Sequence, residues 1–237
     1  MRIRNVLFFF SLVGFGLQAG YANIHVYPNV LNMAYTQSSA DITVQNSGDQ
    51  VAYVEATITK VENPGMPDQK SVNIPEGSSP FEAGIALTPT KMVIPPNGQQ
   101  VVRLIPFVKA TAKDLIYIVN IFPVSGALID HEKVKEGAAS ASVSFTIGYG
   151  VRVILLPKTP VPVLQATRQG KVLEIINTGN TNALLGNGKQ CIDKVCHPID
   201  QSTRLYAGTS WKVTLPYDAP VVFQEDVIGN YSNFTVS

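Results

Sequence analysis

One segment of the sequence, residues 143–157, constrains the fold more than any other. It reads VSFTIGYGVRVILLP. Apolar side chains occupy every second position: Val143, Phe145, Ile147, Tyr149, Val151, Val153 and Leu155. This alternation places them on one face of an extended chain, so the segment predicts a β-strand. It exceeds the usual strand of about five or six residues, and so long a strand can pair within its own sheet while presenting an edge to another chain. Its one charged residue, Arg152, is by itself typical of a solvent-facing position that discourages aggregation.

The first 22 residues have the pattern of a secretory signal peptide. Arg2 and Arg4 supply a basic start, residues 6–17 an apolar core, and Gly20-Tyr21-Ala22 a small-x-small cleavage pattern. We therefore expect an exported protein whose mature chain begins at Asn23. No later run approaches the eighteen or so apolar residues of a transmembrane helix, so membrane insertion is not expected.

The mature chain is nearly neutral. Without Arg2 and Arg4 the 18 basic residues fall to 16, against 17 acidic residues, which leaves a formal charge of −1. This balance provides no basic field that would favour nucleic acid or an anionic membrane as a partner.

Two pairs of segments echo each other along the chain. Residues 41–49, DITVQNSGD, and 173–180, LEIINTGN, each alternate and then end in an Asn-Ser/Thr-Gly turn. Further on, residues 96–104 and 207–215 each place a turn before an alternating strand. The same order occurs twice and helical periodicity is almost absent, which predicts two β-sandwich domains in tandem. Prolines 157, 160 and 162 indicate an extended linker, so we place the domains at 23–157 and 158–237.

The sequence offers no arrangement typical of a catalytic site. His25, His131 and His197 are scattered and suggest neither a catalytic triad nor a metal site. A nucleophile elbow, a Walker loop and an HExxH motif are all missing, and residues 148–150, GYG, lack the third glycine of a dinucleotide loop. We expect a protein that is not an enzyme and that has no cofactor and no metal.

Cys191 and Cys196 are the only cysteines. Together with His197 they would supply three zinc ligands, but a fourth is not evident. An exported protein with an even number of cysteines favours a disulfide instead. So short a loop contributes about 2 to 3 kcal/mol by restricting the unfolded chain, so we expect a structural bond that stabilises a hairpin.

Several segments resemble the periplasmic pilus-assembly chaperones of the chaperone/usher pathway. The resemblance is carried by Asn46, Leu87-Thr88-Pro89, residues 93–104 (VIPPNGQQVVRL), the long strand ending at Pro157, and residues 177–180 (NTGN). Residues 24–28 (IHVYP) and 61–65 (VENPG) look most like the alternate branch, which serves colonisation-factor-type fimbriae. The resemblance covers essentially the whole mature chain. It implies an all-β fold of two immunoglobulin-like β-sandwich domains set in a boomerang.

The resemblance also implies a function. Such a protein is a chaperone in the periplasm of a Gram-negative bacterium, which binds fimbrial subunits by donor-strand complementation and delivers them to an outer-membrane usher. The donor positions fall on Val143, Phe145 and Ile147, with Tyr149 as a further candidate. Three such side chains buried in a subunit groove would contribute roughly 5 to 9 kcal/mol before ordering costs. Alternation alone does not separate donated side chains from the domain's own core. Whether the free protein covers its exposed strand by self-association stays an open question.

The resemblance gives charged residues specific roles. Arg152 falls where the family carries a basic residue that binds the C-terminal carboxylate of the subunit. Many members carry a second cleft arginine in the first strand, but Val30 occupies that position here. Arg103, Asp114 and Asp226 match positions of an interdomain ionic network.

A different class of protein is the alternative. A secreted two-domain adhesin or carbohydrate-binding β-sandwich could form a sugar platform from Trp211 and some of the nine tyrosines. The alternating context of Trp211 favours a core position instead. A third alternative, a fimbrial subunit, would be expected to show one incomplete domain with a donor extension.

Overall fold

The computed structural model describes residues 22–108, 111–124, 147–192 and 195–237. Their elements are strands apart from one short helix. The first half contains β1 (Ile24–Tyr27), β2 (Val30–Met33), β3 (Ala40–Asn46), β4 (Ala52–Glu62), β5 (Lys70–Ile74), α1 (Pro80–Ala83), β6 (Ile85–Thr88), β7 (Lys91–Ile94), β8 (Gln99–Pro106), β9 (Leu115–Val124) and β10 (Tyr149–Leu155). The second half contains β11 (Leu164–Gln169), β12 (Val172–Asn177), β13 (Ala183–Ile192), β14 (Val195–Ile199), β15 (Thr203–Leu205), β16 (Ser210–Thr214), β17 (Val221–Val227) and β18 (Asn230–Val236).

The first half is a sandwich of two sheets. One sheet has the order β1-β3-β8-β6, and the other has the order β2-β10-β9-β4-β5 with β7 beside β4. The apolar positions of both sheets alternate and meet in one core, which includes Ile42, Val44, Leu104, Val54, Val119 and Val153. The alternation of the long segment therefore serves this core along β10, since Val151, Val153 and Leu155 are buried in it.

The second half is a smaller sandwich. Its sheets have the orders β11-β12-β16 and β14-β13-β17-β18, with β15 beside β13. Leu173, Leu185 and Phe223 lie in its core. Trp211 is partly buried against that core, with its ring centroid 5.4 Å from that of Phe223. A partly buried indole that packs on Phe223 gives no support to a sugar platform at this residue.

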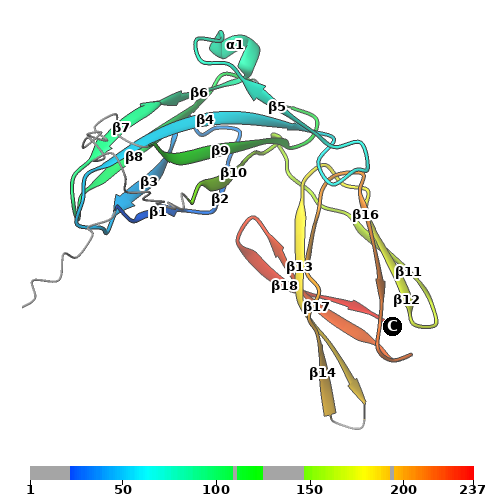
Figure 1. Ribbon diagram of the computed structural model, residues 1–237. Coiled ribbons are helices and arrows are strands. Elements are labelled where there is room, and N and C mark those ends of the chain that lie inside the picture. The colour runs from blue at the N-terminus through cyan, green and yellow to red at the C-terminus, as the bar shows by residue number, and fades with distance from the viewer. Residues whose placement is uncertain (1–21, 109–110, 125–146, 193–194) are drawn as a thin grey trace, which may run out of the picture.

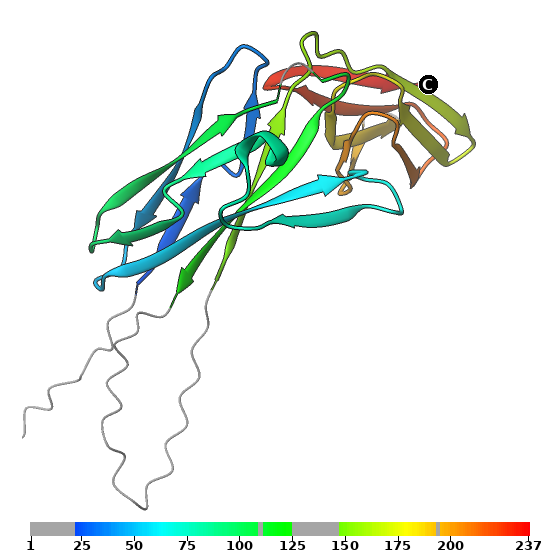
Figure 2. The ribbon, with the colours of Figure 1, turned by 90° about the horizontal axis from the view of Figure 1, so that it is seen from above.

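The two sandwiches form two lobes set at an angle, with β1 to β10 in one lobe and β11 to β18 in the other (Figure 1). The view from above shows the same separation, with the second lobe beside one end of the first (Figure 2). The predicted all-β fold of two immunoglobulin-like sandwiches in a boomerang is therefore confirmed.

A buried asparagine explains the echo between the two halves. Asn46 and Asn177 are both fully buried at the ends of β3 and β12. In each case the side-chain oxygen accepts the backbone N–H two residues later, at 3.0 Å, and the side-chain nitrogen donates to the carbonyl four residues later, at 2.7 Å. Each amide also donates to the carbonyl of a distant segment. The repeated Asn-Ser/Thr-Gly sequence is thus the same buried turn built twice.

The cysteines form the predicted disulfide. Cys191 in β13 and Cys196 in β14 lie opposite each other, with an S–S distance of 2.06 Å. Both sulfur atoms are used in this bond, which rules out the zinc-ligand alternative for them. The described part of the chain also contains no helix that is both long and apolar enough to cross a membrane.

Candidate functional site

Strand β10 has a partly uncovered edge. On one side it pairs with β9 along its whole length, from Tyr149 opposite Ile121 to Leu155 opposite Leu115. On the other side the parallel strand β2 covers only the part from Arg152 onwards. Among the described residues, no strand pairs with the other side of β10 before Arg152. An uncovered strand edge is a template for pairing with another chain.

The predicted donor side chains differ in their surroundings. Val143 and Phe145 lie outside the described residues. Ile147, just before β10, is 70% exposed. Tyr149 is partly buried against the first core, and its hydroxyl donates a hydrogen bond of 2.5 Å to the carbonyl of Ile24. The structure therefore ties Tyr149 to its own domain and leaves Ile147 exposed.

Arg152 lies where the two halves meet. It occupies the face of β10 opposite to the first core, with Val30 of β2 on one side and Ile118 of β9 on the other. Ile154 and Leu156 follow on the same face and pack against Tyr206 of the second half. Arg152 is partly buried, and within the described residues its guanidinium makes no hydrogen bond or ion pair. An unpaired guanidinium beside an apolar contact is available to bind an anion.

Asp114 connects the two halves directly. Its carboxylate accepts hydrogen bonds from the Thr181 hydroxyl at 2.8 Å, the Asn182 backbone N–H at 2.7 Å and the Asn182 side-chain amide at 2.8 Å. Burial raises the pKa of this carboxyl, although those hydrogen bonds lower it. Asp114 thus bonds across the two halves, but its hydrogen-bond partners are uncharged.

The structure does not bring Arg103 to Asp114 or Asp226. Arg103 lies in β8, directly opposite Asp41 of β3, and its Nε is 2.8 Å from an Asp41 oxygen. Both side chains are exposed, and their sheet is not the one that contains β10. The ion pair keeps the pKa of Asp41 below its ordinary value, mainly through the hydrogen bond from Arg103. Strand register, which the sequence did not reveal, pairs Arg103 within its own domain.

Arg204 is a cation of the junction that sequence reasoning missed. It lies in β15 beside Leu184 of β13, and Asp226 of β17 flanks Leu184 on the other side. One Arg204 nitrogen donates to the side-chain oxygen of Asn182. Burial lowers the pKa of Arg204, while the charges of Asp226 and Asp114 raise it. One arginine in a short strand resembles a solvent-facing residue in the sequence, so it carried no signal.

Ile118, the β9 partner of Arg152, lines a hollow on this sheet. Thr57, Thr59, Ser71, Asn73, Ile118, Asn120 and Phe122 are among its lining residues. Thr59 donates to Asn73, and Asn120 donates to Thr59, each at 3.0 Å. No group of histidine, cysteine or acidic side chains in the described ranges could hold a metal ion. The face combines apolar contact area with satisfied polar groups, as a protein-binding surface does.

Comparisons with known proteins point to fimbriae. No family model matches the chain. The chain is 27% identical to a CS1 fimbrial subunit of Escherichia coli over 162 residues, and 26% identical to a CFA/I fimbrial subunit of Escherichia coli over 167 residues. These matches cover 67% and 68% of this chain, but 64% and 66% of the two relatives, just under two thirds of their length.

Solved structures extend the similarity to nearly the whole chain. The class 5 fimbriae chaperone CfaA has a TM-score of 0.65 at 21% identity, over 90% of this chain and 98% of that one. The Escherichia coli chaperone DraB has a TM-score of 0.64 at 14% identity, over 91% and 96%. A complex of Salmonella enterica SafA pilin with the SafB chaperone gives a TM-score of 0.65 at 13% identity, over 92% and 98%. The chain therefore has the fold of fimbrial chaperones.

Proposed function

We propose that this protein is a periplasmic chaperone that binds fimbrial subunits, completes their fold by donor-strand complementation and delivers them to an outer-membrane usher. The observation that carries the proposal is the uncovered edge of β10, which begins beside exposed Ile147 and ends at unpaired Arg152. The fold supports it, because similar structures include a chaperone–tip adhesin complex and a chaperone–pilin complex.

The donated segment precedes the part of β10 that fills the first core. Val143, Phe145 and Ile147 have the same parity as Val151 and Val153, so a continuous strand would present all of them on one face. A subunit strand that pairs with the uncovered edge satisfies its own backbone groups and receives the alternate side chains in its groove. Tyr149 separates the two uses of the strand, because its hydroxyl is bonded to Ile24.

Arg152 anchors the subunit strand that pairs with β10. A guanidinium can bind a terminal carboxylate through two parallel hydrogen bonds and stays charged at any physiological pH. A carboxylate held here sets the register of the subunit strand. A slip of one residue would turn every donated side chain to the wrong face.

Export supports the assignment to the periplasm. The basic start and apolar core of the first 22 residues are typical of a cleaved signal peptide, and the disulfide between Cys191 and Cys196 suits an oxidising compartment. Delivery to an usher follows from the proposed role in fimbrial assembly.

Substituting Ile147 tests the proposal. We expect Ile147→Asp to abolish co-purification of a fimbrial subunit encoded in the same gene cluster, because a charge would enter the apolar groove. Its thermal unfolding should stay close to that of the wild type, since the side chain is 70% exposed. Val93→Asp, at an apolar side chain 56% exposed on β7, is the matched control and should keep full capture. Undiminished capture by Ile147→Asp would refute donation through this segment.

A further inference from the structure

A second guanidinium reaches the junction from the other half of the chain. Arg204 lies in β15, which ends at Leu205, and Tyr206 follows that strand directly. Tyr206 packs against Ile154 and Leu156, which share the face of Arg152 on β10. Arg152 and Arg204 therefore flank the same apolar contact, one from each sandwich.

The charges at the junction also influence one another. Burial lowers the pKa of Arg204, and the positive charge of Arg152 lowers it as well. Burial raises the pKa of Tyr206, whereas the charges of Arg152 and Arg204 lower it. Two positive charges that influence each other repel, and a bound anion would relieve the repulsion.

Both guanidiniums have unused donors. The Nε of Arg204 is buried without a hydrogen-bond partner, although another of its nitrogens donates to Asn182. In the parts of the chain that the structure describes, neither Asp114 nor Asp226 forms an ion pair with Arg204. A buried donor without a partner is unfavourable. An anion with two acceptor oxygens, such as a carboxylate, is suited to unused donors on two cations that border one apolar cluster.

We propose that Arg204, from the second domain, is the second cation of the carboxylate site and binds the subunit's C-terminal carboxylate together with Arg152. The inference rests on the proposed function. In the first domain, the position opposite Arg152 on β2 is held by the uncharged Val30. Because one cation comes from each sandwich, the site is complete only when the two domains are docked. The domain junction is then part of subunit recognition.

The test compares two forms of one subunit, with a free and with an amidated C-terminus. We expect Arg204→Gln to weaken binding of the free-carboxylate subunit by about 10- to 100-fold, the range for a hydrogen bond to a charged group. Binding of the amidated subunit should be weak with the wild type and no weaker with Arg204→Gln. Arg204→Lys should recover part of the loss because it keeps the charge. Lys212→Gln, which removes an exposed charge on β16, should change nothing.

The outcomes separate the two proposals. Equal losses by Arg204→Gln for both subunit forms, or no loss for either, would overturn the role of Arg204. If only Arg152→Gln weakens binding of the free-carboxylate subunit, the role of Arg204 is overturned and the proposed function is retained. A wild-type protein that binds no subunit would overturn both. If Arg204→Gln is unfolded in a thermal scan, binding of the two subunit forms to Arg204→Lys is measured instead. Weaker binding of the free-carboxylate subunit alone supports the site, and any other pattern refutes it.

Discussion

At the scale of single residues, Asp114 is the most direct link between the two sandwiches. Removing its carboxylate in Asp114→Ala leaves the Thr181 hydroxyl and two Asn182 donors without their acceptor. We expect the free energy of unfolding to fall by about 3 kcal/mol, since hydrogen bonds to a charged group are worth about 1.5–3 kcal/mol each before losses to solvent exposure. Urea unfolding measures this. Asp200→Ala, at an exposed carboxylate on the surface, is the control and should stay within about 0.5 kcal/mol of the wild type.

The difference in unfolding free energy between the wild type and Asp114→Ala should depend on pH. Burial raises the pKa of folded Asp114 above its ordinary value of 3.8, so the folded state holds the proton more tightly than the unfolded state. The stability of the wild type relative to Asp114→Ala should therefore rise as the pH falls through the raised pKa towards 3.8, and be constant below it. Unfolding curves at several pH values between 7 and 3 would reveal the slope. A relative stability that falls over this window would contradict the raised pKa.

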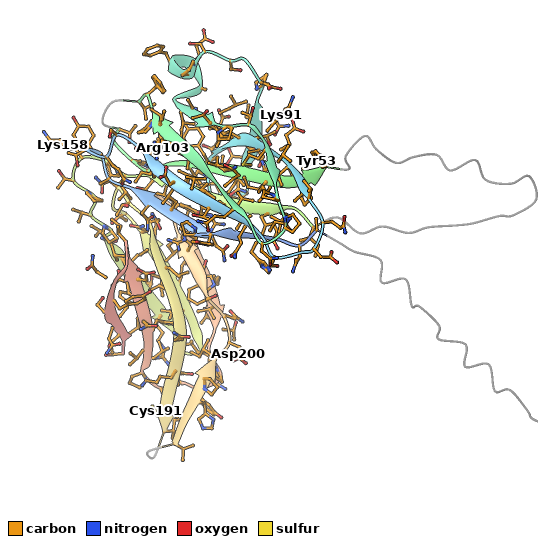
Figure 3. All side chains as sticks on the ribbon, turned by 90° about the vertical axis from the view of Figure 1, so that its left-hand side faces the viewer. Tyr53, Lys91, Arg103, Lys158, Cys191 and Asp200 are labelled. Carbon is orange, nitrogen blue, oxygen red and sulfur yellow. A yellow bond between two sulfur atoms is a disulfide. The ribbon has the colours of Figure 1, made fainter. Side chains whose placement is uncertain are left out.

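At the scale of elements, we expect the disulfide to stabilise the β13–β14 hairpin without affecting the proposed subunit site. Cys191 lies at the end of the second lobe that is remote from the first (Figure 3). The double substitution Cys191→Ser, Cys196→Ser should lower the free energy of unfolding by about 2 kcal/mol, the loop-entropy value for a sequence separation of 5. Subunit capture should be unchanged at temperatures where the protein is folded. Loss of capture by a folded double variant would assign the hairpin a role in binding.

At the scale of the whole molecule, an apolar cluster joins the two sandwiches. Ile116, Ile154 and Leu156 of the first half pack with Tyr206 of the second. We propose that residues 23–157 and 158–237 are the two domains, and that this cluster sets their angle. Leu156→Ala should cost about 2 to 3 kcal/mol and should broaden the distribution of interdomain angles in small-angle X-ray scattering. Leu185→Ala, in the core of the second sandwich, should destabilise that domain without changing the scattering of the folded protein. Identical scattering from a folded Leu156→Ala variant would remove the cluster from this role.

The sequence by itself determined the class of structure. Period-two alternation predicted the strands, and the repeated Asn-Ser/Thr-Gly turn predicted two similar halves. Two cysteines behind a signal-peptide pattern predicted the disulfide. These signals are local, because side-chain alternation and turn chemistry act over a few residues. The alternation of residues 143–157 did not predict which side chains are buried in the core of their own domain. The structure buries Val151 and Val153, bonds Tyr149 to Ile24 and exposes Ile147.

Only the tertiary structure decided which charges meet. Arg103 was predicted to join Asp114 and Asp226, but the register of β3 and β8 places it opposite Asp41. Arg204 carried no sequence signal, yet β15 places it beside Leu184, where it donates to Asn182, the residue that also bonds Asp114. Partners of this kind are distant in the sequence, and strand register and sheet order bring them together. Strand register and the packing of the two sandwiches, rather than any local pattern, therefore decide which of these charges are paired.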